Sequence, residues 1–195
     1  MKKIVLKYRS LLLLVFVPLM SSCGYNSMVQ KQETVTSQWA QVQNVYQRRA
    51  DLIPNLVNTV KGYADFEKST LTAVIEARAK ATSVNIDASK LDANSIKKFQ
   101  EAQDGLKSSL SKLLVVAEQY PNLKANQNFL ELQAQLEGTE NRITVERMKF
   151  NEATQDYNAY IRKFPQMMFA KMFGFQSKPY FEAAQGSEKA PEVKF

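Results

Sequence analysis

The sequence contains no histidine and a single cysteine, Cys23, and these absences exclude several classes of site. One cysteine cannot form an intramolecular disulfide, and a zinc site of the usual kind needs three or four Cys or His ligands. Hydrolases of the Ser-His or Cys-His type would lack their base, and a di-iron bundle would lack its Glu-x-x-His motifs. With six Gly and six Pro in 195 residues, the chain is neither collagen-like nor linker-like. We expect no metal, no cofactor and no enzymatic activity.

The first 22 residues have the composition of an export signal. Four basic residues precede an apolar run over 11–20, and no acidic residue occurs before Glu33. A basic region, an apolar run of about ten residues and small residues at a cut site are typical of a signal peptide, and about 20 apolar residues are needed to cross a bilayer. Ser22 and Cys23 stand at the expected cut, which resembles the bacterial lipoprotein signal, where the cysteine is lipidated. The alternatives are a plain signal peptide with an incidental cysteine, or an uncleaved anchor.

The predicted mature chain, 23–195, is only mildly basic. It holds 22 basic and 19 acidic residues, a net charge of +3, whereas the whole chain carries +7. Nucleic-acid-binding domains usually have a strongly basic face, so we expect no nucleic-acid partner. Small, charged and Pro residues dominate 184–195 and predict a mobile tail. This leaves 23–183 as one folded domain.

That domain is predicted to be helical almost throughout, because apolar residues recur at spacings of three, four and seven. In the last helix the stripe keeps a period of 3.5 over five heptads with only Thr139 and Glu146 polar, which predicts left-handed supercoiled packing. Pro54 and Gly62 are two points at which the first helix could break. The predicted helices are 28–62, 66–84, 95–119 and 127–163.

The lengths of these helices favour one architecture. At the helical rise per residue, the first and last helices are about 52 and about 55 Å long, so both can span a single bundle. The sequence thus predicts an all-α fold: an elongated, antiparallel, up-and-down four-helix bundle of long supercoiled helices. The Met- and Phe-rich stretch 165–175 follows. It could be a lid on one end of the bundle, or a surface for a membrane or a partner.

Six motifs stand out along the predicted domain: RRADLIPNLV at 48–57, VKGYA at 60–64, YPNLKA at 120–125, LEGTENRI at 136–143, YN at 157–158 and FGF at 173–175. Together they resemble the signature of the LemA family. The resemblance covers about residues 25–183 and implies an up-and-down bundle of four long helices in a bacterial envelope, with a membrane-associated assembly role and no settled biochemical activity. Members of the family commonly hold an N-terminal transmembrane helix, whereas this chain has a shorter apolar run and Cys23.

Charged side chains on or beside the apolar stripes form a candidate polar cluster. Arg49 falls on the stripe of the first helix, Glu146 lies on the stripe of the last helix, and Glu140 flanks it. A charge among apolar side chains must be paired or lie near a helix end, so we expect Arg49 to pair with Glu140 or Glu146. A polar groove for a partner peptide, or a catalytic carboxylate pair, are the other interpretations. The candidate residues are Arg48, Arg49, Asp51, Asn55, Glu140, Asn141, Arg142 and Glu146.

Together these patterns predict a membrane-anchored envelope lipoprotein on the exported side of a bacterial membrane, either periplasmic or at the surface. Its expected partners are the lipid bilayer, through Cys23, and a membrane or envelope protein. The first functional hypothesis is a non-catalytic scaffold or adaptor for a membrane protein assembly. The alternative is a receptor-like lipoprotein that binds a peptide or another ligand in a polar groove.

Overall fold

The computed structural model describes residues 2–62 and 67–182, and all of their side chains except those of 2–23 and Ser89. Within these ranges the chain forms helices, turns and coil and no strands, so the predicted all-α class is confirmed. The predicted tail 184–195 lies outside the described residues. The elements are α1 (Lys2–Lys61), α2 (Lys68–Ser83), the short 3₁₀ helix η1 (Ala88–Lys90), α3 (Ala93–Ala117), α4 (Pro121–Lys124), α5 (Gln127–Arg162) and α6 (Gln166–Phe173).

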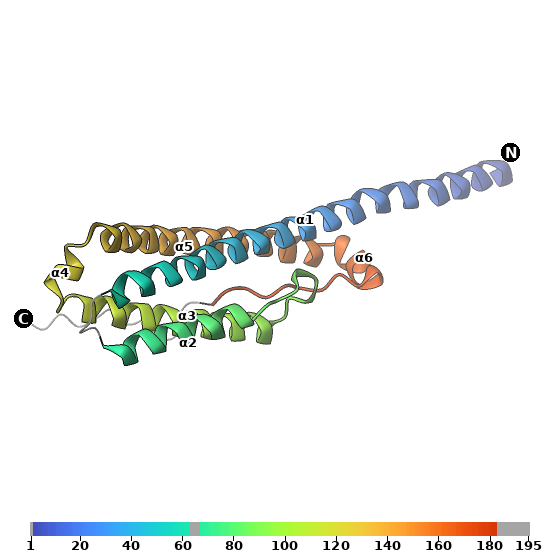
Figure 1. Cartoon of the computed structure of the whole chain (residues 1–195). Helices are drawn as coiled ribbons and strands as arrows, with labels where there is room; N and C mark the ends of the chain where they lie inside the picture. Colours follow the sequence, from blue (N-terminus) through green and yellow to red (C-terminus); the bar gives the residue numbers. More distant parts are fainter. Residues whose placement is uncertain (1, 63–66, 183–195) are drawn as a thin grey trace, which may run out of the picture.

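The four long helices α1, α2, α3 and α5 lie side by side, and each runs opposite to the one before it in the chain (Figure 1). The most extensive helix–helix contacts are between α1 and α5 and between α2 and α3. The short helix α4 connects α3 to α5, and α6 lies at the other end of the molecule. No described helix contains a stretch that is long and apolar enough to cross a membrane.

The first helix continues through Pro54 and ends at Lys61, directly before Gly62. Proline lacks an N–H, so at position 54 it leaves the carbonyl of Ala50, four residues earlier, without its helical donor. Arg78 of α2 supplies that donor, because its Nε donates to the Ala50 carbonyl over 2.8 Å. The contact explains how a proline is accommodated inside a helix that packs against α2. The predicted start of this helix at position 28 is wrong, because α1 begins at Lys2.

The apolar stripe predicted for the last helix is buried over its N-terminal two thirds. Beyond Phe150 the buried face of α5 widens, because Thr154, Asn158 and Ile161 are buried there in addition to Tyr157. Phe164, the last position of the predicted stripe, lies beyond the end of α5 and is 78% exposed. The stripe residues that are buried as predicted are Phe129, Leu132, Leu136, Thr139, Ile143, Phe150 and Tyr157.

The C-terminal segment 174–182 explains why the buried face widens. The side-chain amides of Asn158 and Asn151 each donate to the carbonyl and accept from the N–H of one residue, Lys178 and Phe181 respectively, over 2.8–3.0 Å. Seven residues of helix and three residues of extended chain both advance about 10 Å, so the two amides match the segment in spacing. The two amides hold the C-terminal segment along a second face of α5, and the segment therefore covers that face as well.

Candidate functional site

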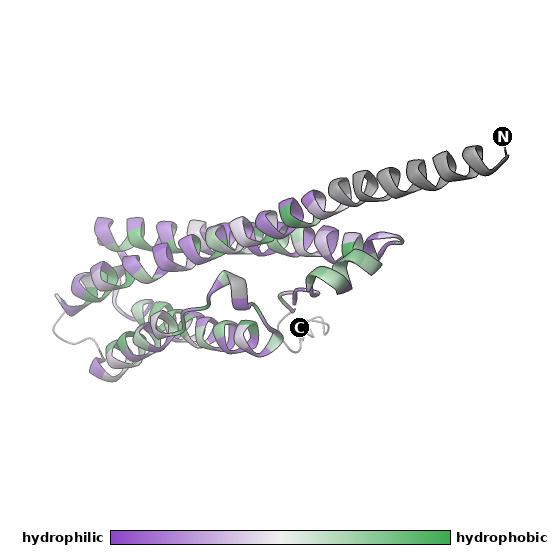
Figure 2. Ribbon diagram, turned by 90° about the vertical axis from the view of Figure 1, so that its right-hand side faces the viewer, coloured by the Kyte–Doolittle hydropathy of each residue, from purple (hydrophilic) through white to green (hydrophobic). Residues whose placement is uncertain are grey.

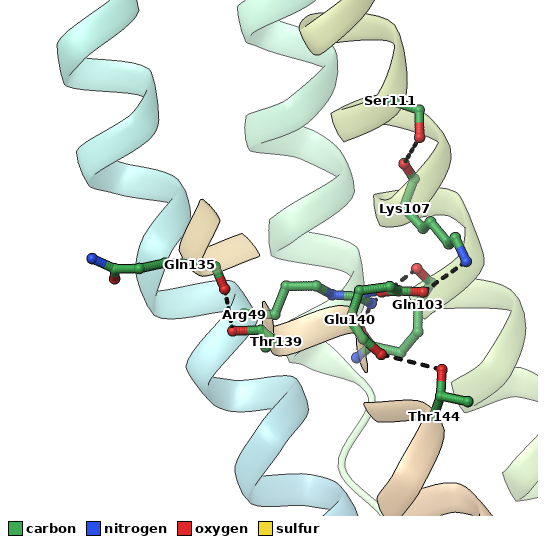
Figure 3. A network of polar contacts seen from close by, with 8 residues as sticks. All are labelled: Arg49, Gln103, Lys107, Ser111, Gln135, Thr139, Glu140 and Thr144. Carbon is green, nitrogen blue, oxygen red and sulfur yellow. Dashed lines mark hydrogen bonds and ion pairs between the residues drawn. The ribbon is translucent and has the colours of Figure 1, made fainter. Parts of the chain in front are cut away.

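Arg49 of α1 is the centre of a buried polar network, and only 3% of the residue is exposed. Its Nη1 donates to Oε2 of Glu140 on α5 over 3.0 Å. Its Nη2 donates to both oxygens of Gln103 on α3, the backbone carbonyl over 3.1 Å and the side-chain Oε1 over 2.7 Å. Figure 3 shows the guanidinium between these two partners. The predicted ion pair of Arg49 with a carboxylate of the last helix is therefore present, and its partner is Glu140.

Two further contacts extend the network to the remaining helix. The side-chain Nε2 of Gln103 donates to the carbonyl of Ala81 in α2 over 3.2 Å. Lys107, one turn after Gln103 on α3, forms an ion pair with Oε1 of Glu140 over 2.6 Å. As a result, groups from α1, α2, α3 and α5 are joined by one continuous set of hydrogen bonds and ion pairs.

This network separates two apolar clusters of the core. One cluster includes Ile53 and Leu136, and the other includes Tyr46 and Ile143. Thr139, which is 2% exposed, lies at the same level on α5 and donates its hydroxyl to the carbonyl of Gln135 over 2.7 Å. The core of the bundle is thus apolar, then polar, then apolar along its length.

The surroundings set the charge state of the network. Burial raises the pKa of the Glu140 carboxyl, but the hydrogen bond from Lys107 and the charges of Arg49 and Lys107 outweigh burial and hold that pKa below its usual value of 4.5. Burial raises the pKa of the Tyr46 hydroxyl above its usual value. The Tyr46 ring lies 5.1 Å from the Arg49 guanidinium carbon, in a cation–π contact. Arg49 Nε is buried without a hydrogen-bond partner among the described residues.

Other members of the predicted cluster lie outside this network. Glu146 pairs with Lys149 over 2.8 Å, and Asp51 is exposed and accepts a hydrogen bond from Gln47. Glu140 and Glu146, the two glutamates of the predicted cluster, are therefore paired with different basic residues and not with each other. The remaining members are exposed: Arg48, Asn55, Asn141 and Arg142.

Gln103 and Lys107 complete the network, although the sequence had not marked them as site residues. Gln103 is a buried polar residue on the apolar face of α3, and a single polar residue on such a stripe is the signal that could have identified it. Lys107 carries no comparable signal, because an exposed lysine on a helix is ordinary.

A pocket of about 200 Å³ opens beside the network between α1 and the α2–α3 pair. Gln103 and Ala81 belong to both the pocket and the network, and no charged side chain lines the pocket. No group of three or more potential metal-ligating side chains occurs in the described part of the chain. The pocket is lined by Gln43, Tyr46, Gln47, Ala50, Ala81, Thr82, Val84, Asn85, Phe99 and Gln103.

Comparison with known proteins identifies relatives of this chain. A family model described as the LemA family matches residues 38–195. "Magnetosome protein MamQ 2" of Paramagnetospirillum magneticum is 26% identical over 175 residues, which cover 81% of this chain and 64% of that protein. "Magnetosome protein MamQ" of Magnetospirillum gryphiswaldense is 25% identical, over 80% of this chain and 64% of that protein. "Protein LemA" of Metamycoplasma hominis is 21% identical, over 82% of this chain and 69% of that protein. The chain therefore spans just under two thirds of the length of the two MamQ relatives.

A double-mutant cycle tests the Arg49–Glu140 pair. We expect Arg49→Met and Glu140→Gln to couple by about 0.5–3 kcal/mol in the free energy of unfolding, because each single change strands the partner of the residue it removes. Urea denaturation of the four proteins gives this coupling. The matched control is Arg49→Met with Glu146→Gln, which should couple by less than about 0.5 kcal/mol. Equal coupling in the two cycles would contradict the assignment of Glu140 as the partner.

The same pair predicts a specific acid sensitivity. Since the pKa of Glu140 is lower in the folded than in the unfolded protein, its ionised carboxylate contributes stability that is fully present above the unfolded pKa and is lost as the pH falls through the folded pKa. The melting temperature of the wild type should therefore fall more steeply than that of Glu140→Gln between about pH 5 and about pH 3. Lys107→Met keeps the carboxylate but removes one of its cations and should give an intermediate slope. Parallel curves for wild type and Glu140→Gln would refute the prediction.

Proposed function

The chain belongs to the LemA family, and from this membership we propose that it is a lipid-anchored envelope protein that acts as a non-catalytic scaffold for a membrane protein assembly. The two MamQ relatives are named as magnetosome proteins. From those names we carry over only the general role of a component in a larger assembly. The proposal includes a lipid on Cys23, removal of 1–22, and a position on the exported side of the membrane.

The observation that supports a scaffold is that the buried charge of Arg49 is paired with side chains of neighbouring helices. Arg49 has its charge partner in Glu140 and further acceptors in Gln103, so it is not available to bind a ligand. A catalytic site would need titrating groups that converge on a pocket, and the pocket beside the network is lined by uncharged side chains. We infer that the polar network has a structural role in an up-and-down four-helix bundle, which leaves the long outer faces to contact partners.

The alternative function is a receptor-like lipoprotein that binds a peptide or another ligand. The pocket between α1 and the α2–α3 pair is the observation that favours it. Ligand sites usually have volumes of roughly 300–1,000 Å³, and the volume here is about 200 Å³. This difference in size is the reason that we rank the scaffold first.

The anchor is tested with Cys23→Ser in the cells that make the protein. Two or more acyl chains hold a protein stably on a membrane, whereas one binds only marginally. We therefore expect Cys23→Ser to release most of the protein from membranes during carbonate extraction. Ser22→Ala, which keeps a small residue before the cut site, should leave it bound. A Cys23→Ser protein that remains fully membrane-bound would show that the segment before position 23 anchors the chain by itself.

The scaffold role is tested by crosslinking in intact membranes. We expect the wild type to enter a crosslinked complex of defined mass with a second envelope protein. Arg49→Met should enter the same complex in proportion to its folded fraction, because the network lies inside the bundle. An uncrosslinked monomer under all conditions would contradict the scaffold. If Arg49→Met melts like the wild type but loses the complex, these charges bind a partner and the receptor-like alternative is favoured.

A further inference from the structure

The end of the molecule at which α6 lies exposes a patch of large apolar side chains. Phe164 is 78% exposed, Met172 67% and Met168 61%. Met167 and Phe173 complete this α6 patch, with exposed fractions of 45% and 50%. Figure 2 shows α6 among the most hydrophobic segments of the chain. Single exposed apolar residues are ordinary, whereas several together mark an interaction surface.

The patch is held in a fixed position on the bundle. Ala170, on the opposite face of α6, is only 4% exposed and belongs to the core cluster, and Phe169 and Phe175 pack against that cluster. The helix ends at Gly174, whose φ of +76° lies in the left-handed region that favours glycine. Because one face of α6 is anchored in the core, its apolar residues on the other face point away from the bundle.

The patch also lies beside α1 at Tyr25. The ring of Tyr25 contacts the rings of Phe173 and Phe175, with centroid separations of 5.0 and 5.7 Å. Cys23 is two residues before Tyr25, and the helical rise is about 1.5 Å per residue. A lipid on Cys23 would therefore enter the bilayer within a few ångströms of the base of the patch.

The sequence segment that carries the patch has charge of one sign. From position 157 to position 181 the sequence contains no acidic residue, and its four basic residues are Arg162, Lys163, Lys171 and Lys178. The first three of these are exposed. Apolar side chains that are flanked by Lys and Arg suit the interface of a bilayer with anionic lipids, where each basic residue near the surface adds about 1 kcal/mol of attraction.

We propose that the α6 patch is a second membrane contact, which inserts Phe164, Met168 and Met172 into the interface of an anionic bilayer next to the anchor. This inference rests on the proposed anchoring at Cys23. A bilayer is favoured over a protein partner by the position of the patch beside the anchor and by the uniformly basic charge of its own segment, 157–181. Two contacts, at Cys23 and at α6, would fix the direction of the long helices relative to the membrane.

The experiment uses the full lipidated protein, reconstituted into vesicles that contain phosphatidylglycerol. A nitroxide is attached at Met172→Cys, and its accessibility to oxygen and to a water-soluble nickel complex is measured. The matched control is Val115→Cys near the end of α3, because Val115 and Met172 are both 67% exposed. We expect the ratio of oxygen to nickel accessibility to be several-fold higher at position 172 than at position 115. Met168→Cys gives an independent second reading of the same patch.

The outcomes separate this inference from the proposed anchor. If the protein floats with the vesicles but labels at 172 and 168 are as accessible to nickel as the label at 115, the anchor stands and the α6 contact is overturned. If the protein does not float, both are overturned. A high ratio at 172 and 168 that falls in vesicles of phosphatidylcholine alone supports both the insertion and the role of the basic residues. A ratio that is unchanged in those vesicles overturns the role of charge.

Discussion

The pairing of one buried cation, Arg49, is the constraint on which the arrangement of the helices depends. A guanidinium that is 3% exposed must be matched by acceptors, because an unpaired buried charge is very costly. Glu140 and Gln103 supply these acceptors from two other helices, and Gln103 reaches a third helix through the carbonyl of Ala81. These contacts link residues at one level of all four helices, so we infer that the network sets the register of the helices between the two apolar clusters.

The adjacent contact between Arg78 and Ala50 serves the same end by a different route. Pro54 removes one hydrogen bond from α1, and Arg78 of α2 replaces the missing donor. Arg78 and Arg49 therefore fix α2 and α5 against two consecutive residues of α1, Ala50 and Arg49. Buried ion pairs generally add little stability compared with apolar packing. We infer that these contacts select one packing of long, repetitive helices, which a scaffold with a defined surface requires.

The C-terminal segment connects the fold to the proposed membrane contact. Asn151 and Asn158 hold it along α5, and the Phe181 ring stacks on Trp39 with a centroid separation of 5.8 Å. Because this segment is held along α5, α6 is attached to the helices at both of its ends, through α5 before it and through the C-terminal segment after it. The apolar patch and Tyr25 of α1 then lie at the same end of an elongated molecule (Figure 1). This geometry would allow one bilayer to contact both the anchor and the patch.

The sequence by itself determined the helical class, the bounds of α2, α3 and α5 and the end of α1 to within a few residues, and most of the buried stripe of α5, because each follows from the periodicity and end signals of a single segment. It did not give the start of α1, which begins at Lys2 and not at position 28. It also placed Arg49 among apolar neighbours and so required a partner. Only the tertiary structure decided between Glu140 and Glu146, and it brought in Gln103 and Lys107, since these choices depend on how helices align. Likewise, the accommodation of Pro54 depends on Arg78 of α2, and the wider buried face at the end of α5 depends on the C-terminal segment, neither of which a local pattern specifies.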